Sequence, residues 1–594
     1  MNPKILLLIT ASVLLTLKIA AQNNSLQTYY EASACMETPR YNETIEFCKK
    51  LEAFSPLLHY TIFGKSPQGR DLPLIIADKN KNFTTEKVKA SGNAVILIQA
   101  CIHAGEPDGK DAGLMLLRDI VTKKEMLLLL DHVTILFIPI FNVDGHERFS
   151  KYNRINQNGP AEMGWRTTAQ NLNLNRDFIK ADAPEMQAWL KLFNEWLPDF
   201  FVDCHVTDGA DYQYSLTYGL ELLGDMMPDL TKWTQEIYLK QVDSMMVKKD
   251  MPIIPYVEFR NWHDPRSGLV SWVSPPMLSQ GYTAIQNRPG LLIETHMLKD
   301  YKIRVTATYE MLKNTLIILN KQYKFLKNIE AETDLLVASS KFREKEMPLD
   351  FNPGKDSVMI DFLGYDYESM KSDVSGGTWF KYNNKKPVTF KVPYFNKQIP
   401  YTFAKLPEAY IIPPEWTDVI ARLAWHGIKY RTLTQETSIA ITSYKFKDVK
   451  WSNKPYEGRT KVQSLDYDEV NESRTFPAGS VLIDMNQRTA RVIAYLFEPR
   501  ANDSFVKWGF FNTIFEQKEY SESYVMEDMS RKMLKDDPKL QTEFDLKKAS
   551  DTAFAKNPDA ILNWFYSKTP YWDSKYNVYP VGKIMGRNII DKLK

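Results

Sequence analysis

The chain has 594 residues, of which 44% are hydrophobic, 25% charged and 12% aromatic, a composition typical of globular proteins with ample core material. This length allows two to four domains. The formal net charge of +2 is nearly neutral for this size and gives no support for nucleic acid or an anionic surface as a partner. Four cysteines are too few for a disulfide framework, although Cys35 and Cys48 could pair in an exported protein.

The first 21 residues have the pattern of a signal peptide. Lys4 supplies a positive charge, residues 5–17 form an apolar segment too short to span a bilayer comfortably, and Ala20-Ala21-Gln22 offers a small-residue cleavage site. The alternative is a membrane anchor. We expect residues 1–21 to be removed, the protein to be exported to the periplasm or the cell exterior, and the mature chain to have no stable membrane span.

Hydrophobic runs and turn residues predict an alternation of strands and helices up to about residue 330. The predicted strands are 60–64, 72–77, 94–100, 133–140, 200–205 and 290–296, and the predicted helices are 44–51, 107–121, 183–196 and 304–327. The succession strand, helix, strand over 94–140 indicates a βαβ unit in a largely parallel sheet. We therefore predict a catalytic domain over 22–332 and a separate C-terminal region over 333–594.

A histidine and a glutamate follow the apolar strand 94–100 directly. His103 and Glu106 are three residues apart, and imidazole and carboxylate are ligands that a catalytic zinc takes. The carboxyl edge of strands in an open α/β sheet is also where ligands bind. Because His-x-x-Glu alone occurs by chance in long chains, the alternative is a strand-end loop with a solvated glutamate.

A third ligand can be sought among the eight histidines, which are His59, His103, His132, His146, His205, His263, His296 and His426. Of these, His103 and His205 both end apolar strands, where they could converge. His146 and His296 also follow strands and remain second choices. Asp203, two residues before His205, could orient an imidazole instead of binding metal.

Two further segments offer charged groups for catalysis. The polar stretch 150–180 contains Arg166, Asn175 and Arg176, and a guanidinium suits recognition of a carboxylate, although a solvated loop is the simpler interpretation. Glu294 lies within the apolar strand 290–296. A carboxylate there is either buried and paired or acts as a general base.

Together these features resemble the zinc metallocarboxypeptidases of the carboxypeptidase A type over roughly residues 50–330. The resemblance rests on five motifs in order: His103-x-x-Glu106, Asn142-x-Asp144-Gly145, Asn175-Arg176, His205 and Glu294. It implies an α/β fold with a mixed, mostly parallel twisted sheet flanked by helices, and one zinc ion per chain. The roles it implies are zinc ligation by His103, Glu106 and His205, general base catalysis by Glu294, binding of the terminal carboxylate by Asn175 and Arg176, and polarisation of the scissile carbonyl by Arg166, with Arg154 as competitor.

The chain departs from this family in its tyrosines. The family's mobile tyrosine lies upstream of the late glutamate, but residues 267–276 contain none, and Tyr282 is nearer to Glu294 than expected. A tyrosine that often follows the third ligand is replaced by Val206-Thr207-Asp208. No tyrosine is therefore assigned, and the specificity pocket is not placed.

Beyond residue 333 the sequence predicts a strand-rich α+β accessory region. Predicted strands are 388–395, 409–412, 428–430 and 437–444, and predicted helices are 414–425, 487–496 and 522–534. This region contains no metal-ligand spacing, phosphate loop or nucleophile motif. Its frequent aromatic residues could form a glycan-binding surface, although core packing is the commoner reason for them.

The sequence thus predicts a secreted zinc exopeptidase that acts on a peptide or protein with a free C-terminus. One alternative is a zinc amidohydrolase acting on acylated amino acids or cell-wall peptides. Another is a noncatalytic binding protein with the same fold. The sequence does not determine the oligomeric state.

Overall fold

The structure is a computed structural model that describes residues 26–593. The predicted signal peptide, residues 1–21, lies outside the described residues. Within them, no helix is both long and apolar enough to cross a membrane. All four cysteines are free, so Cys35 and Cys48 are not paired, and Cys101 and Cys204 are buried.

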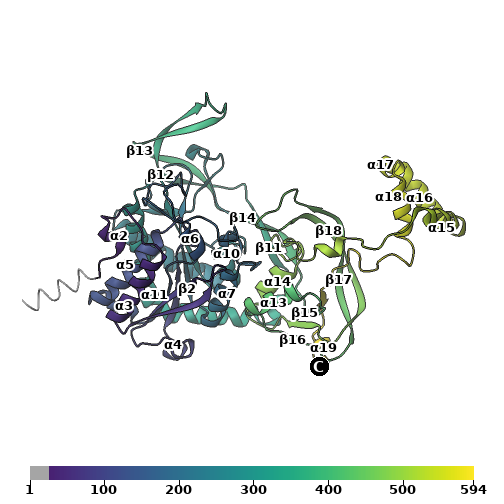
Figure 1. Cartoon of the computed structure of the whole chain (residues 1–594), viewed down its shortest axis with the longest axis horizontal. Helices are drawn as coiled ribbons and strands as arrows, with labels where there is room; N and C mark the ends of the chain where they lie inside the picture. The colour runs from purple at the N-terminus through teal and green to yellow at the C-terminus, as the bar shows by residue number, and fades with distance from the viewer. Residues whose placement is uncertain (1–25, 594) are drawn as a thin grey trace, which may run out of the picture.

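The first part of the chain is built on an eight-stranded mixed sheet (Figure 1). The strands lie in the order β1 (Leu58–Lys65), β2 (Asp71–Ala77), β4 (Val133–Ile138), β3 (Ala94–Gln99), β5 (Phe200–Thr207), β10 (Gly290–His296), β6 (Leu216–Leu220) and β7 (Ile253–Pro255). Strands β4, β3, β5 and β10 are mutually parallel. The predicted βαβ unit and the mostly parallel sheet are confirmed.

Helices cover both faces of this sheet because the central strands are apolar on both sides. In β3, Ile96 and Ile98 pack with α5 and α11, whereas Leu97 packs on the opposite face with α7. The helices of this part are α2 (Tyr29–Ala32), α3 (Tyr41–Phe54), α4 (Thr85–Ser91), α5 (Asp108–Thr122), α6 (Val143–Glu147), α7 (Pro184–Trp196), α8 (Pro228–Trp233), α9 (Lys240–Val247), α10 (Ser279–Ile285) and α11 (Tyr301–Val337).

Two glycines allow α5 to lie unusually close to the sheet. A Cβ atom at Gly109 would lie 2.3 Å from Cys204 Cβ, and one at Gly113 would lie 2.2 Å from Phe137 Cζ. The two glycines are four residues apart and so share one face of the helix. This close packing places the loop before α5, which carries His103 and Glu106, directly against β5.

Replacing Gly109 with Ala should destabilise the protein by about 3 kcal/mol, because the added methyl group would overlap Cys204 unless α5 moves away from β5. Thermal unfolding measures this loss. Gly377→Ala is the control, since its Cβ would meet only Ser375 Oγ at 3.4 Å. Equal unfolding temperatures for the two variants would contradict the prediction.

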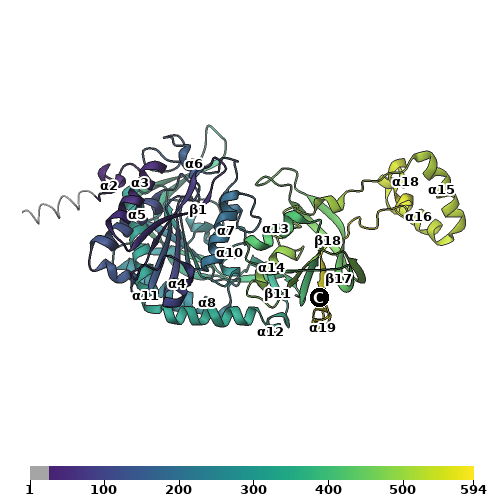
Figure 2. The same cartoon turned by 60° about the horizontal axis from the view of Figure 1, so that its bottom comes forward.

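The second part of the chain begins as α11 ends. This helix runs beneath the first part and continues past residue 332 to Val337 (Figure 2), so the predicted division at 332/333 falls inside it. The division into two domains itself stays a prediction.

The second part consists of antiparallel sheets and short helices. Its strands are β11 (Met347–Pro353), β12 (Val358–Lys371), β13 (Thr378–Phe395), β14 (Gln398–Ala404), β15 (Ala409–Ile412), β16 (Arg431–Thr432), β17 (Thr437–Trp451), β18 (Val462–Phe476), β19 (Val481–Asp484) and β20 (Gly582–Ile584). Its helices are α12 (Ser340–Arg343), α13 (Thr417–Trp425), α14 (Ala490–Phe497), α15 (Ser523–Asp536), α16 (Pro538–Ser550), α17 (Thr552–Ala555), α18 (Pro558–Tyr566) and α19 (Arg587–Ile590). The predicted strand 428–430 is wrong, because those residues lead out of α13 and only Arg431 and Thr432 pair, with β19.

The two parts share apolar and polar contacts. Trp189 and Phe193 of α7 belong to the same buried apolar cluster as Leu423 of α13 and Val492 of α14. Hairpin β12–β13 joins the first part through the short strands β9 (Leu269–Val270) and β8 (Glu258–Phe259). Helices α15–α18 project at the far end of the molecule (Figure 1).

Candidate active site

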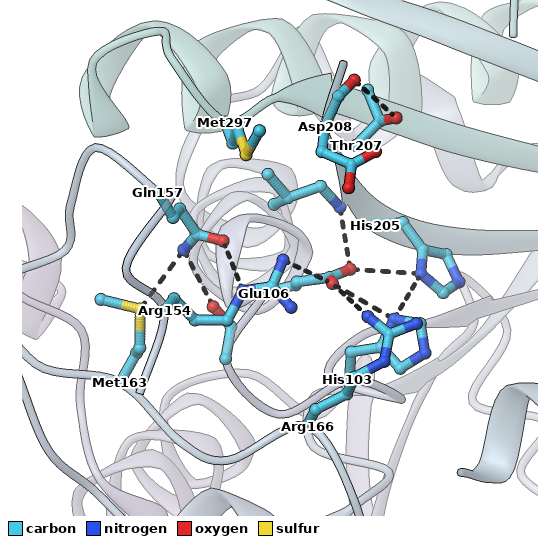
Figure 3. Close-up of polar contacts among 12 residues, drawn as sticks. His103, Glu106, Arg154, Gln157, Met163, Arg166, His205, Thr207, Asp208 and Met297 are labelled. Atoms are coloured by element: carbon cyan, nitrogen blue, oxygen red, sulfur yellow. Dashed lines mark hydrogen bonds and ion pairs between the residues drawn. The ribbon is translucent and has the colours of Figure 1, made fainter. Parts of the chain in front are cut away.

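Three of the predicted site residues converge at the carboxyl edge of the sheet, between β3 and β5. Nδ1 of His205 lies 3.2 Å from Nδ1 of His103 and 3.2 Å from Oε2 of Glu106. Nδ1 of His103 lies 3.2 Å from Oε1 of Glu106. All three side chains are buried, and they can offer ligand atoms within 4.8 Å of one another (Figure 3).

The second nitrogen of each imidazole lies close to a polar neighbour. Nε2 of His205 lies 2.9 Å from Oδ2 of Asp203, whose other oxygen accepts a hydrogen bond from Gln99. Nε2 of His103 lies 3.1 Å from Oδ1 of Asn173. Such partners fix the ring orientation and leave Nδ1 free to bind a metal.

The donor set fits zinc. Two imidazole nitrogens and one carboxylate are a ligand set of catalytic zinc sites. A neutral imidazole whose proton is on Nε2, beside Asn173 or Asp203, presents a lone pair at Nδ1. The two Nδ1 atoms lie 3.2 Å apart and both face the Glu106 carboxylate, so no hydrogen-bond donor lies among these acceptors. A cation between them removes this mismatch.

Burial and neighbouring charges set the protonation of the three residues. Burial lowers the pKa of His103 to about 4, which favours the neutral, ligating form. Burial alone would raise the pKa of Glu106, but His103 and Arg154 outweigh it and hold that pKa well below its usual range. Burial would lower the pKa of His205, but Asp203 raises it well above the usual value.

A cavity of about 480 Å³ opens at this cluster. Besides the three residues, its lining includes every other predicted site residue, namely Arg166, Asn175, Arg176 and Glu294. Arg154 lines it as well. The structure therefore brings all the predicted site residues around one cavity, while the role of each remains a prediction.

Glu294 lies on β10 beside His205, with which it is in parallel register. Its Oε2 is buried and has no hydrogen-bond partner among the described residues. Burial raises the pKa of Glu294 to about 8. A carboxyl group with such a pKa can exchange a proton near neutral pH.

Two arginines contact Glu106. Nη2 of Arg154 lies 2.9 Å from Oε1 of Glu106, and Nη1 of Arg166 lies 3.5 Å from the same oxygen (Figure 3). The Arg154 side chain is 17% exposed and that of Arg166 is 41% exposed. Gly105 permits this arrangement, since a Cβ there would lie 2.9 Å from Cγ of Arg154.

The second-choice histidines, His146 and His296, contact residues outside the three-residue cluster. Nε2 of His146 lies 2.9 Å from Nζ of Lys110, and Nε2 of His296 donates to the Ala210 carbonyl. His426 is buried between Tyr282 and the Ile179 carbonyl.

Several residues of the site were missed from the sequence. Asn173 holds His103, and Tyr218, Tyr256 and Tyr394 line the cavity. Tyr394 belongs to β13, beyond residue 333, and no local pattern connects it to the motifs. The tyrosine-rich stretch 212–218, which ends on β6 beside Glu294, was the available signal for Tyr218.

Comparison with known proteins identifies the same part of the chain. Residues 44–218 match the profile of the family described as zinc carboxypeptidase. Carboxypeptidase 2 of Trichophyton equinum is 22% identical over 491 residues, covering 79% of this chain and 84% of that protein, and the Trichophyton rubrum protein of the same name is 21% identical. Carboxypeptidase A of Helicoverpa armigera is a similar solved structure, with 15% identity, a TM-score of 0.36, and coverage of 51% of this chain and 80% of that one.

The family match spans β3, α5 and β5, and so includes His103, Glu106 and His205, the residues that converge in the structure. The matched segment and the site geometry therefore concern the same part of the chain. The segment 44–218, which carries the three converging side chains, thus matches the zinc carboxypeptidase family, and relatives aligned over 79% of this chain are named carboxypeptidases.

Proposed function

We propose that this protein is a zinc-dependent exopeptidase that releases the C-terminal residue of peptides with a free carboxylate. The observation that carries the proposal is that one cavity is lined both by the His103–Glu106–His205 cluster and by Arg176. A hydrolytic centre beside a fixed cation selects the bond next to a terminal carboxylate.

The chain's own residues divide the chemistry among them. A zinc ion bound by the three side chains would supply Lewis acidity, which polarises a peptide carbonyl and acidifies water. Glu294 accepts the proton of the attacking water and delivers it to the leaving amine. Its buried position beside His205 and its raised pKa suit both transfers.

Arg166, rather than Arg154, is the residue that we propose to stabilise the negative charge developing on the carbonyl oxygen. Arg154 is more buried and is paired with Glu106 at 2.9 Å, so its charge is already balanced. Arg166 is the more exposed of the two and lies farther from Glu106, at 3.5 Å.

We propose that the cavity favours an apolar terminal side chain, because several of its lining residues are large and apolar. Among them are Leu220, Leu222, Leu278 and Leu292, together with Trp272. Burying a substrate side chain of leucine or phenylalanine size here contributes about 1.5–3 kcal/mol, whereas an unpaired charge would lose its hydration.

A substrate panel tests this proposal. Peptides ending in Leu, Phe, Lys or Glu, their C-terminal amides, N-acyl amino acids and cell-wall peptides would be compared with and without a zinc chelator. We expect hydrolysis of free-carboxylate peptides with apolar ends, abolished by the chelator and restored by zinc. Preferential hydrolysis of N-acyl amino acids or cell-wall peptides would favour the amidohydrolase, and near-stoichiometric zinc without turnover would favour a binding protein.

Arg176→Ala should lower kcat/KM for free-carboxylate peptides about 100-fold, because a charge-assisted bidentate contact with the substrate is lost. Binding of C-terminally amidated peptides should not change, since they lack the charge that Arg176 recognises. Arg500→Ala, at a partly exposed arginine of the second part, is the control for loss of an arginine. Equal losses for both kinds of peptide would remove Arg176 from this role.

We also propose that the protein is exported. The apolar segment 5–17 with its preceding lysine and following small residues supports this. Cell fractionation with N-terminal sequencing of the mature protein tests it, and a mature protein that begins at Met1 in the cytoplasm would contradict it.

A further inference from the structure

A tight turn of the second part reaches the predicted carboxylate-binding segment. It lies in the connection between β17 and β18, where Tyr456 and Arg459 exchange backbone hydrogen bonds of 2.9 and 3.0 Å. The two residues between them, Glu457 and Gly458, have φ values of 49° and 78°. Two consecutive positive φ values are characteristic of a type I′ hairpin turn. We refer to residues 456–459 as the hairpin turn.

An ion-pair cluster fixes the hairpin turn to the first part. Arg459 donates from Nε and Nη2 to the two carboxylate oxygens of Asp182, at 2.7 and 2.6 Å. Arg422 of α13 donates to the same carboxylate at 2.8 Å. The Arg459 guanidinium also stacks over the Phe510 ring, 3.7 Å from its centre. A bidentate, partly buried contact of this kind holds the turn in one position.

The other two side chains of the hairpin turn contact the segment 173–176. The backbone N–H of Asn173 donates to Oε2 of Glu457 at 3.0 Å. Nε of Arg176 donates to the hydroxyl oxygen of Tyr456 at 3.1 Å. Both contacted residues serve the site, since Asn173 holds His103 and Arg176 lines the cavity.

These contacts orient the Arg176 guanidinium. Nε is engaged by Tyr456, and Nη1 donates to the Asn175 carbonyl at 2.7 Å. Because the guanidinium is planar, two such bonds fix the plane of the whole group. In the part of the chain that the structure describes, Nη2 has no protein acceptor, which leaves it available for a ligand carboxylate.

We propose that Tyr456 and Glu457 are positioning residues for the substrate's terminal carboxylate, so that the second part of the chain completes the peptide-binding site. Tyr456 acts through Arg176, and Glu457 acts through Asn173, whose Oδ1 accepts a hydrogen bond from the Asn175 N–H at 3.0 Å. The inference rests on the proposed function for the identity of the ligand. It assigns the C-terminal region a direct part in substrate recognition.

The test is a comparison of Tyr456→Phe with the parent protein in steady-state kinetics. Loss of the hydroxyl removes one acceptor from a charged donor, so KM for free-carboxylate peptides should rise about threefold to tenfold while kcat changes less than twofold. Zinc content and unfolding temperature should stay unchanged. A residue with only a structural role would instead lower the unfolding temperature and leave KM unaltered.

Glu457 supplies a second pair of variants. Glu457→Gln keeps an acceptor for the Asn173 N–H and should behave almost like the parent protein, whereas Glu457→Ala should raise KM. Lys454→Ala, at an exposed residue of the same connection, is the matched control and should have no effect. Equal KM values for Glu457→Ala and Lys454→Ala would overturn the role of Glu457.

A double-mutant cycle separates action through Arg176 from a direct effect. In an Arg176→Ala background, Tyr456→Phe should have no further effect on KM. A similar rise in both backgrounds would overturn the inference.

A binding measurement separates this inference from the proposed function. In a Glu294→Gln background, Tyr456→Phe should raise the Kd of a free-carboxylate peptide about threefold to tenfold and leave that of its amide unchanged. An unchanged Kd would overturn the inference whatever the activity. A shifted Kd together with a parent protein, Glu294 intact, that hydrolyses none of the free-carboxylate peptides would support the inference and refute the proposed function.

Discussion

Glu294→Gln should lower kcat for peptide hydrolysis at least about 1,000-fold, because the variant keeps the shape of the side chain but cannot accept a proton. Glu294 is buried beside His205, and its Oε2 has no protein partner among the described residues, so the change breaks no hydrogen bond within the described part of the chain. Zinc content and unfolding temperature should remain those of the parent protein. Product analysis at fixed reaction times measures kcat. Metal quantification gives the zinc content, and thermal denaturation gives the unfolding temperature.

Glu185→Gln is a matched control for this substitution. Glu185 is also a buried carboxyl group without a hydrogen-bond partner among the described residues, and burial raises its pKa to about 7, but it lies on α7 and does not line the cavity. It should retain full activity. Parent-like activity in Glu294→Gln would remove Glu294 from the role of general base.

His205→Ala should weaken zinc binding at least about 100-fold and abolish hydrolysis. Loss of a hydrogen-bond partner of a ligand already costs about 10–100-fold in metal affinity, and loss of the ligand itself should cost more. Without His205, only His103 and Glu106 of the three-residue cluster would remain to bind the metal. Titration against a competing chelator gives the affinity, and dialysis with zinc analysis gives the stoichiometry.

His132→Ala serves as the comparison, since His132 is exposed and stacks on Tyr323 away from the cavity. The zinc affinity of Asp203→Asn should lie between those of His205→Ala and His132→Ala, about 10–100-fold below that of the parent protein. The reason is that His205 remains in place but loses its charged partner. Full zinc occupancy in His205→Ala would show that the metal is held elsewhere.

Much of the site could be predicted because its residues stand at the ends of strongly apolar strands. His103 follows β3, while His205 and Glu294 lie near the ends of β5 and β10, and the carboxyl ends of parallel strands meet at one edge of a sheet. The same alternation of strands and helices predicts the fold of the first part. The weakest secondary-structure prediction, a strand at 428–430, concerned a short apolar run, for which hydrophobic pattern alone does not distinguish a strand from a helix end.

Other parts of the site depend on contacts between distant segments. Asn173 lies in an irregular loop, and its role follows only from its 3.1 Å contact with His103. Tyr394 reaches the cavity because β13 pairs with β9 of the first part. The contact between Tyr456 and Arg176 joins residues 280 positions apart and depends on a hairpin turn fixed by Asp182.

The sequence by itself predicted the candidate metal ligands, since ligand types and their positions after apolar strands are local properties, and the order of its motifs carried the resemblance to zinc metallocarboxypeptidases. Only the tertiary structure decided which polar neighbours orient those ligands, how exposed each of the two arginines is beside Glu106, and that the second part of the chain contacts the carboxylate-binding segment. These features arise from packing between segments distant along the chain, and no spacing within either segment encodes them.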